Sequence, residues 1–272
     1  MIQVSKNIKI KDIVNIINEK SPSVSGIVNQ ECKGKLWVDN IHKPRIAIAE
    51  SFATGSFYFL GIYETKEDFA NLKAFLENDL FILLKKNGYT CFEFSIESEI
   101  LHKNILEIFK DKAIQTEKEY SFRINTIPKV KQSIPNGYQL RKVDNTLWNR
   151  LLQGKYQNEE LLKIRLLESW HSFDEFMSKS VAYCTILDNR IVAVLVGTAS
   201  FNKVIVIDIE TEERHRRMGL AYGIAVEFIT DCLKSKYIPQ WDCVESNSNS
   251  YKLAKKLGFE KIRENTVYWF NI

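Results

Sequence analysis

The sequence predicts an α/β fold of the α+β kind, in which helices flank a mixed, largely antiparallel β-sheet. Three observations lead to this prediction. In the C-terminal half, β-rich runs outnumber the helical segments that connect them, which disfavours a purely parallel sheet. Two of these runs lie only three residues apart, as in a β-hairpin. The chain has 272 residues, of which 45% are hydrophobic, so it can bury one large core or two modest ones.

A segment rich in turn-forming residues divides the chain. Residues 124–140, "INTIPKVKQSIPNGYQL", contain two prolines and an Asn-Gly pair, which is typical of a linker. We therefore predict an N-terminal domain over residues 1–128 and a C-terminal domain over residues 137–272. Each half has an ordinary domain size.

The elements of the C-terminal half follow from the spacing of its apolar residues. Apolar residues at helical spacing predict helices over 144–156 and 158–170, and β-rich runs predict a hairpin of strands 181–187 and 191–197. A strand over 203–210 precedes a long amphipathic helix over 219–236. A buried strand over 240–245, a short helix over 248–257 that ends at Gly258, and a closing strand or hairpin over 260–270 complete the half.

A weak internal repeat relates the two halves. Residues 62–99 and 208–247 both read as strand, helix and strand, with "ET" before the helix and "ES" after the second strand. The first copy has "KEDF" where the second has "RHRRMGLA", so it lacks the cations and the glycine. The N-terminal half is therefore either a degenerate duplicate of the C-terminal half or a separate lid.

The turn "ETEERHRRMGLAYG", residues 210–223, is the strongest candidate site. The first amides of a helix are unpaired and lie at the positive end of its dipole, where phosphate binds well if the backbone is accessible. Gly219 and Ala221 give that access, and Arg214, Arg216 and Arg217 supply cations for a diphosphate. A basic surface corner is the alternative interpretation.

A second motif follows one helix and one strand later. The segment "NSNSYKLAKKLGF", residues 247–259, begins at Asn247 and ends in Lys-Leu-Gly-Phe. Together the two motifs resemble those of the Gcn5-related N-acetyltransferase (GNAT) superfamily, whose acetyl-CoA loop reads R/Q-x-x-G-x-G/A and whose later helix ends K-x-G-F. The resemblance covers residues 137–272. Within the superfamily, "GKLWVDN" (34–40) and "FYFLG" (57–61) are similar to segments of the zwittermicin A resistance acetyltransferases.

The resemblance implies that acetyl-CoA is the co-substrate and assigns residues to it. The pantetheine arm would lie between the strands 203–210 and 240–245 and pair with the main chain of Ile209, Glu210 and Thr211. The pyrophosphate would bind the backbone amides of the loop, whose members are Arg216, Arg217, Met218, Gly219, Leu220 and Ala221. Asn247 would contact the arm from the opposite strand, or would instead cap the helix that follows it.

The implied reaction is direct attack of a neutral amine on the thioester, which requires a proton acceptor. Glu210 is the predicted base and Asp208 the second choice, although either is also an ordinary strand-end carboxylate. Many family members carry a tyrosine that protonates the leaving thiolate, but this chain has Ala254 at that position. Tyr251, one turn earlier, is the candidate substitute, with simple packing as the alternative. A thiol is already a tolerable leaving group, so transfer does not require this acid.

The acceptor implied by the resemblance is a primary amine of a small molecule, such as an antibiotic or an amino sugar. The alternative is a non-catalytic acyl-CoA sensor, which the loss of the usual tyrosine favours. The N-terminal half would cover the acceptor cleft or mediate a homodimer, and it is expected to bind no CoA.

Charge and cysteine content exclude several other classes. A net charge of +4 from 38 cationic and 34 anionic residues is too small for a dedicated nucleic-acid binder. No apolar run approaches the length of a membrane span, and no signal peptide is evident. The five cysteines form neither a metal-ligand pattern nor a disulfide framework, so we expect reduced thiols, no metal and a cytoplasmic protein.

Overall fold

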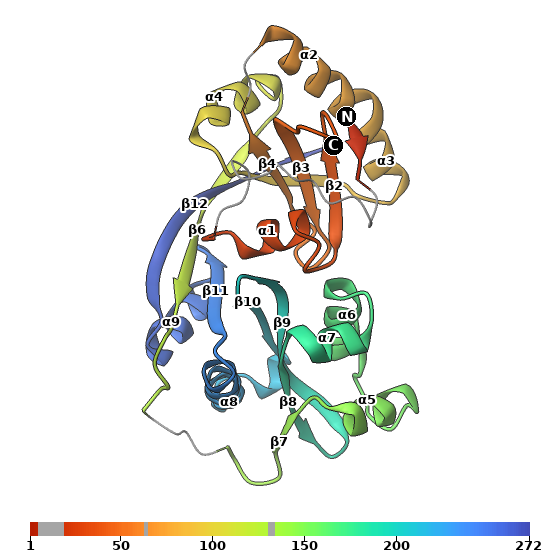
Figure 1. Cartoon of the computed structure of the whole chain (residues 1–272). Helices are drawn as coiled ribbons and strands as arrows, with labels where there is room; N and C mark the ends of the chain where they lie inside the picture. The colour runs from red at the N-terminus through yellow and green to blue at the C-terminus, as the bar shows by residue number, and fades with distance from the viewer. Residues whose placement is uncertain (5–18, 63–64, 130–133) are drawn as a thin grey trace. The chain divides into compact units, whose positions relative to one another are not determined.

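The computed structural model of the chain describes residues 1–4, 19–62, 65–129 and 134–272. These residues form two compact units (Figure 1). The first unit comprises Met1–Glu119 and Glu264–Ile272, and the second comprises Tyr120–Arg263. Strands β6 (Gln115–Arg123) and β12 (Glu260–Asn271) each cross this boundary. The predicted domains 1–128 and 137–272 are each one continuous stretch of the chain, whereas the first unit includes a C-terminal segment. The predicted limits therefore stay a prediction.

The first unit contains a mixed sheet in the order β1-β2-β3-β4-β5-β12. Strands β4 and β5 are parallel, and the other pairings described in this unit are antiparallel. The strands span Ile2–Gln3 (β1), Gly34–Val38 (β2), Ile46–Ser51 (β3), Phe57–Gly61 (β4) and Cys91–Ile96 (β5). The last part of β12 pairs with β5, from Val267 opposite Ser95 to Asn271 opposite Cys91.

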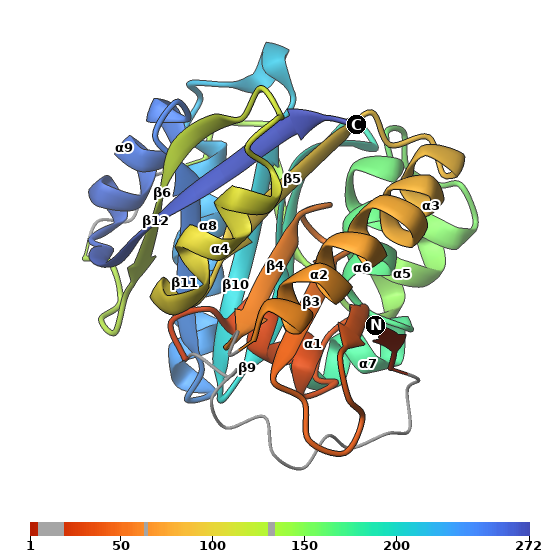
Figure 2. The same ribbon diagram turned by 90° about the horizontal axis from the view of Figure 1, so that it is seen from above.

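Helices cover this sheet around an aromatic core. The helices are α1 (Pro22–Val28), α2 (Lys66–Phe75), the π-helical turn Leu76–Leu80, α3 (Phe81–Lys86) and α4 (Glu99–Ile108). Figure 2 shows α2, α3 and α4 lying over the strands. Phe59, Phe92, Phe94, Phe109 and Phe270 are buried and pack against one another in this layer. This unit therefore has a hydrophobic core of its own.

The second unit contains a sheet in the order β6-β11-β10-β9-β8-β7. Its strands are β7 (Gln139–Lys142), β8 (Ala182–Leu187), β9 (Arg190–Phe201), β10 (Val204–Thr211) and β11 (Ile238–Val244). The predicted hairpin of β8 and β9 is present, and Asp188 and Asn189 in its turn both have positive φ, as a type I′ turn requires. Strands β10 and β11 are parallel, so the mixed, largely antiparallel sheet predicted from the sequence is confirmed.

Helices lie on both faces of this second sheet. The helices are α5 (Asn145–Leu152), α6 (Glu160–Ser169), α7 (Phe173–Lys179), α8 (Leu220–Lys234) and α9 (Ser248–Leu257). Ile224 and Phe228 of α8 pack in a core with Ile207 and Trp241 of the sheet. Leu162 and Leu166 of α6 are buried outside this core, next to β9. One face of the sheet therefore carries α8 and the other carries α6.

The two units share one order of elements. In the first, β4 leads through α2 and α3 to the parallel strand β5 and then to α4. In the second, β10 leads through α8 to the parallel strand β11 and then to α9. This order agrees with the internal repeat in the sequence, while the degenerate-duplicate interpretation stays a prediction. Of the helices in the described residues, none is both long and apolar enough to span a membrane.

Candidate functional site

Strands β10 and β11 diverge after a short paired stretch. Their pairing runs from Val204 opposite Ile238 to Ile207 opposite Trp241, yet β10 continues to Thr211 and β11 to Val244. Strand β9 pairs with the other edge of β10 as far as Thr211. A β-bulge beside Ile207 precedes the divergence, and bulges bend a strand. The main chain over 208–211, which includes the predicted residues Ile209, Glu210 and Thr211, therefore presents an open sheet edge.

The N-terminus of α8 lies directly after this edge and carries no side-chain cap. Gly219 is its N-cap, with φ of +81°, and no acidic residue occupies the first turn. A left-handed N-cap suits glycine because a side chain is strained there. The first amides of the helix have no partner within it, which is the arrangement that suits an anion.

Cations surround this helix start. Arg214, Arg216 and Arg217 are exposed, and Arg217 also has a positive φ, of 63°. Arg216 Nε donates to the carbonyl oxygen of Thr211 over 3.1 Å, which ties the turn to the end of β10. The side chain of Met218 is exposed, that of Leu220 is buried in the core, and Ala221 is half-buried. The loop residues predicted from the sequence thus lie together at one helix start.

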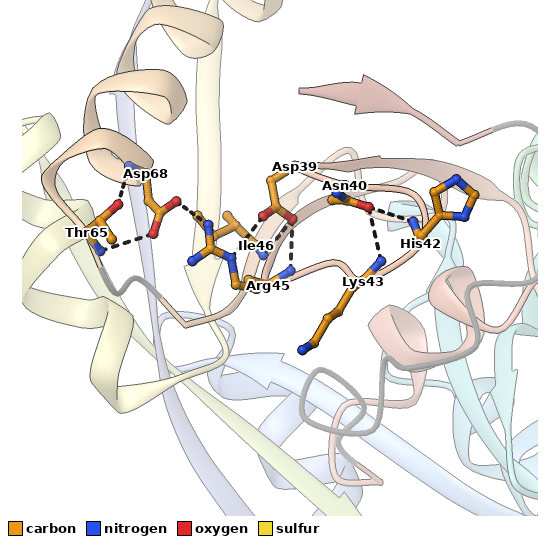
Figure 3. A network of polar contacts seen from close by, with 8 residues as sticks. All are labelled: Asp39, Asn40, His42, Lys43, Arg45, Ile46, Thr65 and Asp68. Carbon is orange, nitrogen blue, oxygen red and sulfur yellow. Dashed lines mark hydrogen bonds and ion pairs between the residues drawn. The ribbon is translucent and has the colours of Figure 1, made fainter.

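The corresponding helix start in the first unit is closed by its own side chains (Figure 3). Thr65 Oγ1 accepts from the amide of Asp68, and Asp68 Oδ2 accepts from the amide of Thr65, each over 3.1 Å. Arg45 pairs with the other oxygen of Asp68 over 2.5 Å. Glu67 adds a second acidic residue to the first turn of α2. Carboxylates already occupy the positive end of this helix, so it is unsuited to phosphate.

Two carboxylates of β10 share one guanidinium. Arg165 of α6 donates from Nε to Asp208 over 2.6 Å, and it also pairs with Glu210 through its NH2 group. Asp208 and Glu210 are two residues apart on the strand, so they lie on one face, opposite Ile207 and the α8 core. Glu210, the predicted base, therefore lies beside the open edge with a cation bound to it.

The two remaining predicted residues lie on or next to α9. Asn247 is the N-cap of this helix, and its side-chain oxygen accepts from the amide of Ser250 over 3.1 Å. The capping alternative is thus present, and contact of Asn247 with a ligand stays a prediction. The ring of Tyr251 makes edge contacts with Tyr120 and Phe122 of β6, the neighbour of β11 on the side away from β10. This packing favours a structural role for Tyr251.

The structure adds two residues to those that the sequence predicted. Arg165 is one of them, and its pairing with Glu210 joins positions 45 residues apart in the chain. Asp242 is the other. It directly follows Trp241, the last residue of β11 that pairs with β10, and so it lies where the two strands diverge. Only the register of β10 against β11 shows that Asp242 lies at this point, and a single sequence does not give that register.

Other side chains that could react or bind metal are buried or already engaged. Trp170 and Trp241 are buried. His215 is half-buried, and its ring contacts the Tyr138 hydroxyl over 2.9 Å. The five cysteines are free, and burial raises the pKa of the Cys184 thiol to about 12. No cluster of three or more potential metal ligands occurs among the described residues.

Comparison with known proteins identifies the family of this chain. The profile described as GNAT acetyltransferase matches residues 15–268. A Bacillus subtilis (strain 168) protein named uncharacterized N-acetyltransferase YdfB is 27% identical over 250 residues, which cover 90% of this chain and 89% of that protein.

Solved structures share the fold. A GCN5-related N-acetyltransferase-like protein from Streptococcus suis 89/1591 superposes with a TM-score of 0.61 and 21% identity, covering 87% of this chain and 88% of the other. A tandem GNAT protein from the clavulanic acid biosynthesis pathway, solved without AcCoA, gives a TM-score of 0.54 at 8% identity and covers 99% and 97%. Because the family profile spans most of its length, this chain belongs to the GNAT acetyltransferase family.

Proposed function

We propose that this GNAT acetyltransferase transfers the acetyl group of acetyl-CoA to a primary amine of a small molecule. The observation that carries this proposal is the uncapped start of α8 at Gly219, placed directly after the open edge of β10. An extended chain of amides can pair with a strand edge, and a diphosphate can accept from the helix amides. The pantetheine arm would thus pair with the edge of β10 and the diphosphate with the amides of α8, both within the second unit.

The residues present fit such a ligand. The amides after Arg216 and the three exposed arginines match a diphosphate in charge, and no acidic residue competes with it in the first turn of α8. In the reaction, the amine nitrogen attacks the thioester carbonyl and the sulfur leaves as a thiolate, while a carboxylate accepts the amine proton. An antibiotic or amino sugar as the acceptor follows only from the resemblance to zwittermicin A resistance proteins, and a cytoplasmic location follows from the expectation of reduced thiols.

A thiol-release assay tests this function. The intact chain is incubated with acetyl-CoA and, separately, with polyamines, aminoglycosides, amino acids and peptides. We expect one amine class to release coenzyme A together with a product heavier by one acetyl group in mass spectrometry. Absence of thiol release with every class, in a protein that binds acetyl-CoA, would contradict the transferase.

A non-catalytic acyl-CoA sensor is the second candidate. Ala254 stands where many family members place the acid tyrosine, and Tyr251 packs against β6. Calorimetry separates the two functions, because a sensor binds acetyl-CoA while the full amine panel releases no thiol.

We predict that one coenzyme A binds per chain. The α2 start is occupied by the Thr65–Asp68 capping box and by Arg45, whereas the α8 start is uncapped. Isothermal titration of the full chain should therefore saturate at one equivalent. Two equivalents, or one equivalent that persists after Gly219→Glu, would show that the first unit binds the ligand. Homodimerisation through the first unit remains a separate proposal, which sedimentation velocity would test.

A further inference from the structure

Strands β10 and β11 place two carboxylates side by side where they begin to diverge. Ile207 and Trp241 form the last pair of the parallel strands, and both pack in the α8 core. Asp208 and Asp242 are the next residues of the two strands, so both side chains lie on the opposite face. Paired strands are about 4.8 Å apart, and the two carboxylates directly follow the last pair, on the same face, where the strands begin to open.

Polar partners hold Asp242 on this face. Gln240, two residues earlier on β11, donates from Nε2 to Asp242 Oδ1 over 3.1 Å. Arg123 of β6 in turn donates to Gln240 Oε1 over 2.9 Å, which fixes the amide with its NH2 group toward Asp242. The Ser121 hydroxyl of β6 also bonds Asp242. Neutral donors of Gln240 and Ser121 thus orient the carboxylate, and Arg123 supports this arrangement through Gln240.

The carboxylates of β10 are held differently. Asp208 and Glu210 both accept from the Arg165 guanidinium, a group that stays protonated in proteins. A proton acceptor must offer a lone pair to the amine, and a carboxylate paired with a permanent cation offers it less readily. The hydrogen bonds of Asp242 come instead from the neutral groups of Gln240 and Ser121, while Arg123 and Arg263 act on it through their charge.

We propose that Asp242, and not Glu210, accepts the proton of the attacking amine. This role rests on the proposed function and specifies its substrate as an amine that arrives at the β10–β11 opening. As the nitrogen–carbon bond forms, the nitrogen loses a proton to the Asp242 carboxylate. As the carbon–sulfur bond breaks, the departing thiolate takes up a proton, and the products are an N-acetyl amide and the free thiol of coenzyme A. One proton moves from nitrogen to sulfur, so the step balances without another reactant.

The electrostatic surroundings of Asp242 agree with such a role. Burial raises the pKa of its carboxyl, while hydrogen bonds from Ser121 and Gln240 and the charges of Arg263 and Arg123 oppose the rise. A base whose pKa is moved up toward the working pH accepts a proton more effectively. The groups that act on it are Ser121 and Arg123 on β6, Gln240 on β11 and Arg263 on β12. Asp208 on β10 follows the last residue pair of the two strands, as Asp242 does.

Matched charge-neutral variants test this assignment. Asp242→Asn, Glu210→Gln and Asp208→Asn each remove one carboxylate from the same face at constant size. With the amine found in the thiol-release assay, Asp242→Asn should lower kcat by about 100-fold or more, the range typical of general bases. It should also abolish the acidic limb of the kcat/KM pH profile, and Asp242→Glu should restore that limb. Glu210→Gln removes a carboxylate that is already paired with Arg165, so it should lower kcat less than Asp242→Asn does and should keep the limb.

Two further readouts separate a proton acceptor from a structural residue. Coenzyme A affinity of Asp242→Asn should equal that of the wild type. Its Tm should be no lower near neutral pH, because a carboxyl whose pKa is raised by folding opposes folding once it ionises, and asparagine does not ionise.

Several outcomes would overturn the assignment. These are wild-type kcat in Asp242→Asn, a lowered Tm or coenzyme A affinity in that variant, or a 100-fold loss confined to Glu210→Gln. A wild-type chain that binds acetyl-CoA but acetylates no amine would instead remove the transferase function, and the role of Asp242 with it.

Discussion

Gly219→Glu should abolish acetyl-CoA binding and, with it, acetyl transfer. The substitution introduces a carboxylate at an uncapped helix start whose amides are the proposed diphosphate donors. Hydrogen bonds to charged groups contribute about 1.5–3 kcal/mol each, so the loss of two of them weakens binding by roughly 10²–10⁴-fold. Repulsion between the new carboxylate and the diphosphate adds to this loss. Calorimetry with coenzyme A and the thiol-release assay measure the two effects.

Gly154→Glu is the matched control. Gly154 has φ of +65° and is exposed, and no atom beyond its two chain neighbours lies within 4 Å of the place where a Cβ would stand. The same change therefore imposes the same kind of backbone strain and the same charge. A side chain in the left-handed region costs about 1–2 kcal/mol of stability in each variant. Equal Tm values together with coenzyme A binding in Gly154→Glu alone would support the site. Comparable binding in both variants would exclude a diphosphate at α8.

Trp241→Ala should destabilise the second unit more than any single surface change. The indole is 1% exposed, packs against Phe259 and donates to Ser250 Oγ over 2.7 Å. Truncation of a buried tryptophan typically costs about 3–5 kcal/mol of unfolding free energy, which exceeds a third of the stability of many domains. Chemical denaturation measures this loss.

Trp241→Phe distinguishes packing from hydrogen bonding. It keeps most of the apolar volume but removes the indole N–H, so we expect a smaller loss of about 1 kcal/mol. Trp241 is the last residue of β11 that pairs with β10, next to the open edge proposed to bind the pantetheine arm. We therefore also expect weaker coenzyme A binding in Trp241→Ala than in Trp241→Phe. Equal stability of the two variants would mean that the indole contributes little to the core.

Local signals in the sequence predicted much of the second unit. Gly219 before an amphipathic helix and Gly258 after a short one both have the left-handed conformation that favours glycine at helix ends. Asn247 was expected to cap α9 or to contact the ligand, and the cap is present. Each of these features depends on residues within one turn of each other, so a single sequence contains the necessary information.

Features that join distant segments could not be predicted in this way. The contact of Arg165 with Glu210 depends on how α6 lies over β10, and the adjacency of Asp208 and Asp242 depends on strand register. A shift of one residue in either strand would turn one of these carboxylates to the other face. The pairing of β12 with β5 likewise joins positions far apart in the chain. The spacing of apolar residues predicts a strand but does not show which other strand it pairs with.

The route of β12 has a consequence for how the protein is made. Residues Glu264–Ile272 belong to the first unit, where they pair with β5 and bring Phe270 into its aromatic core. These residues are translated after the whole of the second unit, so the first unit lacks the β5–β12 ladder and one ring of its core until the second unit has been made. The first unit therefore completes its fold only after the second unit has been synthesised, and a nascent chain stalled before residue 264 should leave the first unit sensitive to protease.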